Sequence, residues 1–173
     1  MPKTPFEFDA VDWVVRRYSG LSGFSRENIQ SALDFALVWS LFESECCKKF
    51  VRAKDLGVIA KRLGNKKSLA VPADKIFAFL RERYWTAADA QKRFKNLRIR
   101  DDNHKDILQS SFKGDDLEFG ELKIHAVLIV TYRYRNNFFH GNKSAREILK
   151  SGELFARSAA FLSHVIEHCG NGE

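Results

Sequence analysis

The chain has 173 residues, of which 45% are hydrophobic and 29% charged. That length suits about one domain, and so much apolar material excludes a disordered tail or a fibre. The longest apolar stretches without a charge, 35–42 and 126–132, fall well below the roughly 18 residues of a membrane span. Glu7 stands where a signal peptide would carry its apolar run. We expect one soluble domain over residues 1–173, with no membrane partner.

Charge and cysteine content give the next constraints. The chain carries 29 Lys and Arg against 22 Asp and Glu, a formal net charge of +7. Such an excess attracts polyanions, of which RNA and DNA are common. The three cysteines are Cys46, Cys47 and Cys169. Sequence neighbours are poorly placed to bridge each other, and three thiols make no disulfide framework. We predict buried thiols at Cys46 and Cys47, and a cytoplasmic location where thiols stay reduced.

Apolar residues recur at helical spacing along most of the chain, and Gly and Pro mark the breaks. The pattern predicts a first helix over 8–18, a long helix over 25–50 that Ser25 caps, and a short helix over 54–63. The long helix is apolar around most of its circumference, which predicts a central position. Its predicted core residues are Ile29, Leu33, Phe35, Ala36, Leu37, Val38, Trp39, Leu41 and Phe42.

The second half of the chain completes an all-α pattern. Pro72 suits the first turn of a helix that ends near residue 80. Residues 81–120 form a polar, basic excursion of short helices and loops. Segment 121–140 is too long for an ordinary strand, and its helical spacing predicts a buried helix that stops at Gly141. A capping-box pattern at Ser144 starts a last helix over 144–169. The predicted fold is an up-and-down bundle of four to five main helices, with its core over about 25–169.

One segment has more hydrogen-bonding groups than a core helix needs. Residues 132–143 read Tyr-Arg-Tyr-Arg-Asn-Asn-Phe-Phe-His-Gly-Asn-Lys. The run Arg-Asn-x-x-Phe-His-Gly, residues 135–141, resembles the Arg-x4–6-His motif of HEPN domains. These are α-helical bundles found in prokaryotic RNA-cleaving toxins and phage-defence proteins, and some members only bind nucleotides. HEPN toxins that pair with a nucleotidyltransferase antitoxin carry Tyr two residues after the His, where this chain has Asn142.

Metal-free RNA cleavage needs a base for the 2′-hydroxyl proton, an acid for the departing 5′-oxygen and a cation for the charge on phosphorus. Histidine titrates near neutral pH and suits either proton-transfer role, here His140. Arginine offers a planar fork of donors to phosphate, here Arg135, and Asn136 is a neutral donor and acceptor. One chain supplies one such histidine, so the resemblance implies a homodimer through 121–144. It also gives an antitoxin as a candidate partner.

The motif leaves one choice open, because residues five apart lie about 140° apart on an ideal helix. Arg135 and His140 therefore share a face only if the helix unwinds before Gly141. Otherwise Arg133, which lies on the same side as Asn136, Asn137 and His140, is the phosphate ligand. The family pattern, which places a polar residue directly after the arginine, favours Arg135. Arg133, Asn137 and Lys143 are then predicted to bind nucleic acid.

Two other patterns have competing interpretations. Residues 81–105 mix cations with Tyr84, Trp85 and Phe94, which is typical either of single-strand binding or of a solvated helix face. Its predicted nucleic-acid ligands are Lys92, Arg93 and Lys95. His164-x-x-Glu-His168 matches a zinc-peptidase signature, but the chain ends before a further carboxylate ligand. We therefore predict a polar helix end there, and neither a metal nor a cofactor.

The leading hypothesis is a metal-independent endoribonuclease of HEPN type, acting as a toxin or phage-defence effector. A rival hypothesis is a non-catalytic HEPN module that binds nucleotide or RNA and mediates assembly. A third is a helical interaction protein in which residues 135–140 are only a polar helix terminus.

Overall fold

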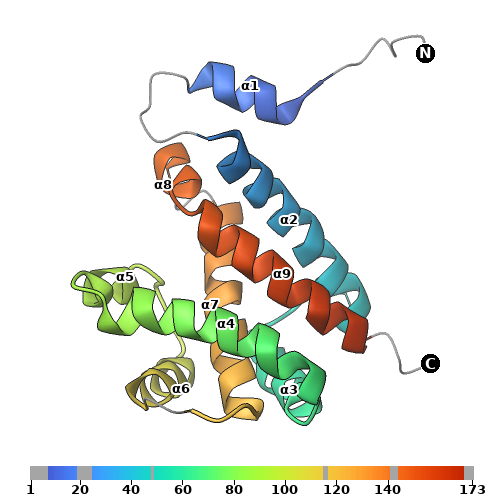
Figure 1. The fold of residues 1–173 in the computed structure, drawn as a ribbon, viewed down its shortest axis with the longest axis vertical. Coiled ribbons are helices and arrows are strands. Elements are labelled where there is room, and N and C mark those ends of the chain that lie inside the picture. Colours follow the sequence, from blue (N-terminus) through green and yellow to red (C-terminus); the bar gives the residue numbers. More distant parts are fainter. Residues whose placement is uncertain (1–7, 19–24, 48, 115–116, 141–143, 170–173) are drawn as a thin grey trace.

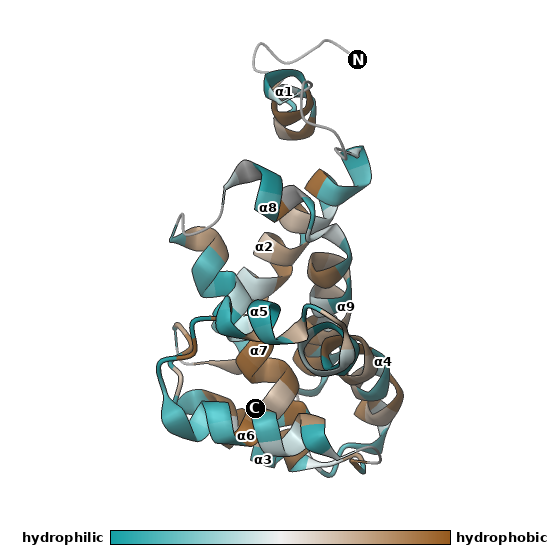
Figure 2. Ribbon diagram, turned by 90° about the vertical axis from the view of Figure 1, so that its left-hand side faces the viewer, coloured by the Kyte–Doolittle hydropathy of each residue, from teal (hydrophilic) through white to brown (hydrophobic). Residues whose placement is uncertain are grey.

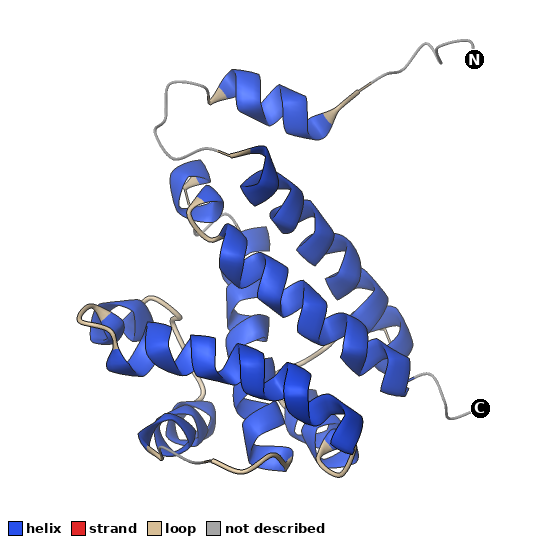
Figure 3. Ribbon diagram, viewed as in Figure 1, coloured by secondary structure: helices blue, strands red, loops and turns tan. Residues whose placement is uncertain are grey.

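The computed structural model describes residues 8–18, 25–47, 49–114, 117–140 and 144–169. Within these ranges the chain forms helices and no strand (Figure 3), which confirms the all-α prediction. The elements are α1 (Ala10–Arg17), α2 (Arg26–Cys46), α3 (Asp55–Leu63), η1 (Lys67–Leu69), α4 (Ala70–Arg81), η2 (Glu82–Thr86), α5 (Ala90–Lys95), α6 (Asp102–Lys113), α7 (Glu121–Phe139), α8 (Ala145–Leu149) and α9 (Gly152–Cys169). No helix in the described ranges is long and apolar enough to cross a membrane.

Helices α2 and α9 lie side by side and run in the same direction (Figure 1). At their N-terminal ends the backbones approach so closely that a Cβ on Gly152 would meet the Asn28 side chain. At their C-terminal ends Cys46 and Cys169 form a disulfide. The predicted up-and-down arrangement is not confirmed by this pair, because the two helices are parallel neighbours. The helices between them form one long crossover that returns the chain to the end where α2 began.

Helix α7 is the central element of the fold. It packs against α3, α4 and α6, and every residue from Ala126 to Thr131 is buried. Figure 2 shows this part of α7 as hydrophobic, whereas α5 and α6 are largely hydrophilic. Its buried cation, Lys123, donates to Asp74 over 2.6 Å and lies over the Phe77 ring. The predicted helix over 121–140 is thus confirmed, with its end at Phe139.

The predicted core face of α2 is only partly correct. Its Phe35, Trp39 and Phe42 are buried against α9 and α7, but Leu33, Leu37 and Leu41 are 41–63% exposed. A sequence apolar on several sides does not reveal which side meets a neighbour. Burying apolar surface contributes roughly 25 cal/mol per Å². The large aromatic rings offer the most such surface, and their burial therefore decides the rotation of the helix.

The predicted last helix over 144–169 is two helices. The capping box at Ser144 is present, since its hydroxyl accepts from the Glu147 N–H and the Glu147 carboxylate accepts from the Ser144 N–H. The helical conformation is then interrupted at Lys150 and Ser151. The Ser151 hydroxyl donates to the Glu147 carbonyl, and the Tyr134 hydroxyl donates to Ser151. Gly152 starts α9 because only a glycine fits so close to α2.

The disulfide corrects the prediction for the cysteines. Cys46 is bonded to Cys169, 123 residues away, and among the described residues Cys47 is the free thiol. Burial raises the pKa of Cys47 to about 11, which makes it a poor nucleophile. The cytoplasmic prediction rested on the absence of a bridge, so this pair removes its support.

Candidate functional site

The C-terminal end of α7 carries the residues of the HEPN-like motif. The helix stays regular up to Phe139, and the His140 N–H donates to the Asn136 carbonyl over 3.1 Å. Arg135 and His140 therefore project from different sides of the helix, and no unwinding brings them onto one face. His140 is exposed at the helix end. Lys143, the next predicted ligand, lies outside the described residues.

Arg135 is held by partners on two sides of its guanidinium group. Nη2 donates to the Glu43 carboxylate over 3.2 Å, and Nη1 donates to Asn136 Oδ1 over 3.1 Å. The guanidinium also lies over the rings of Trp39 and Phe139. Because its side chain is only 25% exposed, these contacts fix its orientation before any ligand arrives.

Glu43 is a site residue that the sequence interpretation missed. It lies near the end of α2, its side chain is 13% exposed, and its Oε1 also accepts the Val51 N–H over 3.1 Å. A carboxylate next to the buried Phe42 on a core helix was the available signal, because a buried acid needs a partner. That partner, Arg135, lies 92 residues away in sequence.

Arg133 and Asn137 hold the loop between α5 and α6. Arg133 donates from Nε to the Leu97 carbonyl over 3.1 Å and from Nη2 to the Arg98 carbonyl. Asn137 is buried, and its amide donates to the carbonyls of Asn96 and Leu97. Burial lowers the pKa of Arg133. The two side chains predicted to bind nucleic acid are thus committed to backbone carbonyls in this structure.

These contacts support an unusual backbone conformation. Arg98 has a φ of 53°, in the left-handed region that costs a non-glycine residue about 1 kcal/mol or more. The hydrogen bonds from Arg133 and Asn137 to the carbonyls of residues 96–98 offset that cost. The loop is consequently fixed to the same side of α7 as His140, two turns before the helix end.

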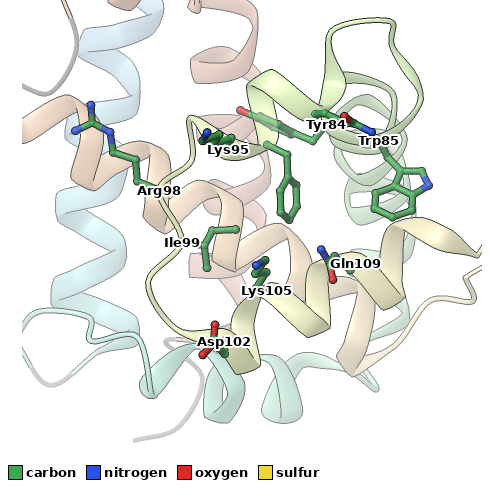
Figure 4. Close-up of a pocket in the computed structure, with 10 residues that line it drawn as sticks. Tyr84, Trp85, Lys95, Arg98, Ile99, Asp102, Lys105 and Gln109 are labelled. Atoms are coloured by element: carbon green, nitrogen blue, oxygen red, sulfur yellow. The ribbon is translucent and has the colours of Figure 1, made fainter.

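The predicted basic segment divides into two kinds of cation. Arg93 pairs with Asp89 over 2.7 Å, whereas Lys92 and Lys95 are exposed with no ion pair within the described part of the chain. Lys95 borders a hollow of about 690 Å³ between η2, α5 and α6 (Figure 4). Its lining residues are Tyr84, Trp85, Gln91, Phe94, Lys95, Arg98, Ile99, Asp102, Lys105 and Gln109.

The histidines of the zinc-like pattern have other partners. His164 Nδ1 lies 3.4 Å from the Glu167 carboxylate, and His168 Nε2 shares a 2.9 Å hydrogen bond with Ser68. The adjacent Cys169 is in the disulfide. Across the described ranges no group of three His, Cys, Asp or Glu could hold a metal ion.

The predicted dimer segment is also buried over much of its length. Ile124 and residues 126–130 belong to the core of this chain. The exposed positions of α7 therefore lie at its two ends, Glu121 and Leu122 at the start and Phe139 at the end. The chain matches no known family model, no curated protein and no solved structure. The HEPN resemblance therefore rests on residues 135–141 and on the all-α architecture.

Proposed function

We propose that the chain is a metal-independent endoribonuclease of HEPN type. The single observation that carries the proposal is the fixed Glu43–Arg135–Asn136 group directly before the exposed His140. An arginine oriented in advance costs less to place on a phosphate than a flexible one. These three half-buried polar groups gather where the C-terminal parts of α2 and α7 meet, and they exceed what packing requires.

In the proposed reaction the neutral imidazole of His140 takes the proton of the RNA 2′-hydroxyl. The 2′-oxygen attacks phosphorus, the bond to the 5′-oxygen breaks, and that oxygen receives a proton from an acid. Arg135 stabilises the charge that develops on the phosphate oxygens. Because Arg135 and His140 of one chain project from different sides of α7, this proposal requires that they meet at one phosphate across the interface between two copies. Glu43 acts as a positioning residue, because its carboxylate holds Arg135. The products are a 2′,3′-cyclic phosphate and a free 5′-hydroxyl.

The acid is a second imidazole in this proposal, supplied by His140 of a second copy. The chain offers one candidate histidine at the motif, so two chains related by a symmetry axis would supply base and acid together. We propose that the exposed end of α7 faces this copy. A toxin or defence role and an antitoxin are the biological setting that the HEPN resemblance implies.

The test is RNA cleavage by purified protein in EDTA. Replacing His140 by Ala should slow cleavage roughly 10²–10⁴-fold, the usual contribution of acid–base catalysis. RNA affinity should change little, because the charged side chains hold the phosphates. Replacing His164 by Ala is a matched control, since that exposed histidine lies on α9. Equal cleavage by wild type and the His140 variant overturns the proposal.

A second candidate function is a non-catalytic module that binds RNA or nucleotide. The observation in its favour is that Arg135 already has a carboxylate partner, which reduces the charge it can offer a phosphate. The two candidates give opposite results in the same assay. A module of this kind binds RNA with the affinity of the wild type when His140 is replaced, and neither protein cleaves it.

A further inference from the structure

The hollow between η2, α5 and α6 has the size and lining of a ligand site. Its volume of about 690 Å³ lies within the roughly 300–1,000 Å³ usual for small-molecule sites. One wall comes from the π-helical turn η2, where the Ala87 N–H donates to the Glu82 carbonyl. Single π-helical turns of this kind are frequent at functional sites. The opposite wall comes from the loop and first turns of α6.

Three aromatic residues, Tyr84, Trp85 and Phe94, line this hollow. Trp85 is 40% exposed and, among the described residues, has no ring or hydrogen-bond partner. Phe94 is half-buried and packs against the core, which fixes its position. An indole that is open on one side is a stacking platform for a base, and every nucleobase has a face that can stack on it. Figure 4 shows Trp85 and Gln109 at one end of the hollow and Arg98 and Ile99 at the other.

The polar groups around the rings fit the rest of a nucleotide. Lys95 and Lys105 are exposed, and neither has an ion-pair partner in the part of the chain that the structure describes. Their ammonium groups can therefore donate hydrogen bonds to phosphate oxygens. The amides of Gln91 and Gln109 each offer a donor and an acceptor, and the Asp102 carboxylate accepts, as the edges of bases require.

The hollow is held in shape by α7. Arg98 and Ile99 on its wall continue the loop that Arg133 and Asn137 fix through backbone carbonyls. The side of α7 that makes these contacts is also the side of His140, and Arg133 precedes His140 by about 10 Å along the helix axis. An RNA strand seated in the hollow would therefore run toward the side of α7 that carries His140.

We propose that this hollow binds one nucleotide unit, with its base stacked on Trp85 and a phosphate at Lys95 and Lys105. The ligand chemistry, a base joined to an anionic phosphate, is shared by single-stranded RNA and by a free nucleotide. The choice of RNA as the source rests on the proposed function. In that setting the hollow positions the strand and His140 acts on a neighbouring linkage.

The first experiment measures the binding of a short, labelled, 2′-O-methylated single-stranded RNA, which lacks the attacking hydroxyl. Replacing Trp85 by Ala should weaken binding roughly tenfold, the usual contribution of one stacked base. Trp85→Phe should retain most of the affinity. Trp13→Ala is the matched control, because that exposed indole lies on α1. Equal affinity of wild type and Trp85→Ala overturns the proposal.

A second variant covers the case in which Trp85→Ala does not fold. Lys95→Gln combined with Lys105→Gln changes exposed side chains only, and should weaken binding and flatten its salt dependence. Unchanged affinity and salt dependence in this double variant overturn the phosphate part of the site. Quenching of Trp85 fluorescence by the RNA, lost in Trp85→Phe, reports stacking directly.

Adenosine 5′-monophosphate in the same titration distinguishes the two sources. Quenching by the mononucleotide at an affinity equal to that of the RNA supports a nucleotide site, whereas quenching by the RNA alone supports a strand-binding site. Quenching by neither overturns the proposal. If Trp85→Ala binds RNA more weakly but still cleaves it at saturating RNA, the result supports both proposals. Binding at Trp85 without any cleavage by wild type refutes the nuclease and retains the site.

Discussion

Glu43 and Arg135 form an ion pair of 3.2 Å that joins the C-terminal part of α2 to the C-terminal part of α7. The two residues lie 92 positions apart. Both side chains are largely buried, and the pair also holds Val51 through its N–H and Asn136 through its amide oxygen. This contact sets the direction of the guanidinium at the motif.

Replacing Glu43 by Gln should affect both stability and RNA cleavage. Loss of the buried charge leaves Arg135 without its partner, and we expect the free energy of unfolding to fall by about 1–3 kcal/mol. Cleavage should fall mainly in kcat, because the arginine is no longer oriented for the transition state. Urea unfolding and steady-state kinetics measure the two effects. Glu45→Gln, on the exposed side of α2, should change neither.

Replacing Asn137 by Ala should weaken the fold near the hollow. The variant removes two donors from the carbonyls of Asn96 and Leu97, and we expect a loss of about 1–3 kcal/mol. Hydrogen exchange should rise in the loop over 96–98 before it rises elsewhere. Asn103→Ala, an exposed position on α6, is the control. A stability equal to wild type would show that the loop does not need this contact.

Charge reversal at Lys92 and Lys95 should weaken RNA binding in a salt-dependent way. Each lost phosphate contact should reduce the slope of log affinity against log salt by about 0.7 for a single strand. Fluorescence anisotropy at several salt concentrations measures that slope. Reversal at Lys61 and Lys66, both exposed and far from the hollow along the chain, is the matched control. Equal slopes in the two double variants would contradict a specific basic surface.

Acidification should destabilise the protein through two neighbouring imidazoles. The rings of His104 and His125 lie 5.6 Å apart, and burial lowers the pKa of both below 6.5. The charge of Arg133 further lowers the pKa of His104, which Asp101 opposes. The charge of His104 further lowers the pKa of His125, which Glu121 opposes. The unfolded chain therefore binds more protons, and the stability present above pH 6.5 is lost as the pH falls below it.

Chemical denaturation at a series of pH values measures this loss. His125→Leu should flatten the dependence of the unfolding free energy between neutral pH and pH 5, because it removes one of the two titrating groups. His164→Ala, at an exposed position on α9, is the control. A profile of His125→Leu identical to wild type would assign the acid sensitivity to other groups.

Reduction of the disulfide should lower stability. The bridge between Cys46 and Cys169 closes a loop of more than a hundred residues, and we expect its loss to cost about 2–5 kcal/mol. Thermal unfolding with and without dithiothreitol measures this. Cys46→Ser should mimic reduction, whereas Cys47→Ser should respond to dithiothreitol as wild type does. A melting temperature insensitive to dithiothreitol in wild type would contradict a bridge that stabilises the fold.

The sequence by itself determined most of the helices and several of their ends, although it did not reveal the break between α8 and α9. Helical hydrogen bonds join residues four apart, so periodicity, caps and breaks are properties of a single segment. Ser25 and Ser144 cap helices where the pattern predicts it, and segment 121–140 is a helix despite its strand-like composition. The position of Arg135, Asn136 and His140 at the end of a buried helix was also readable from the chain.

Only the tertiary structure decided which of these residues meet. Three features depend on how distant helices are rotated and placed. They are the exposure of Leu33 on α2, the disulfide between Cys46 and Cys169, and the ion pair of Arg135 with Glu43. Local pattern carries no information on that placement, because several rotations of an apolar helix bury similar area. The hollow beside Trp85 arises in the same way, from three elements that no single segment specifies.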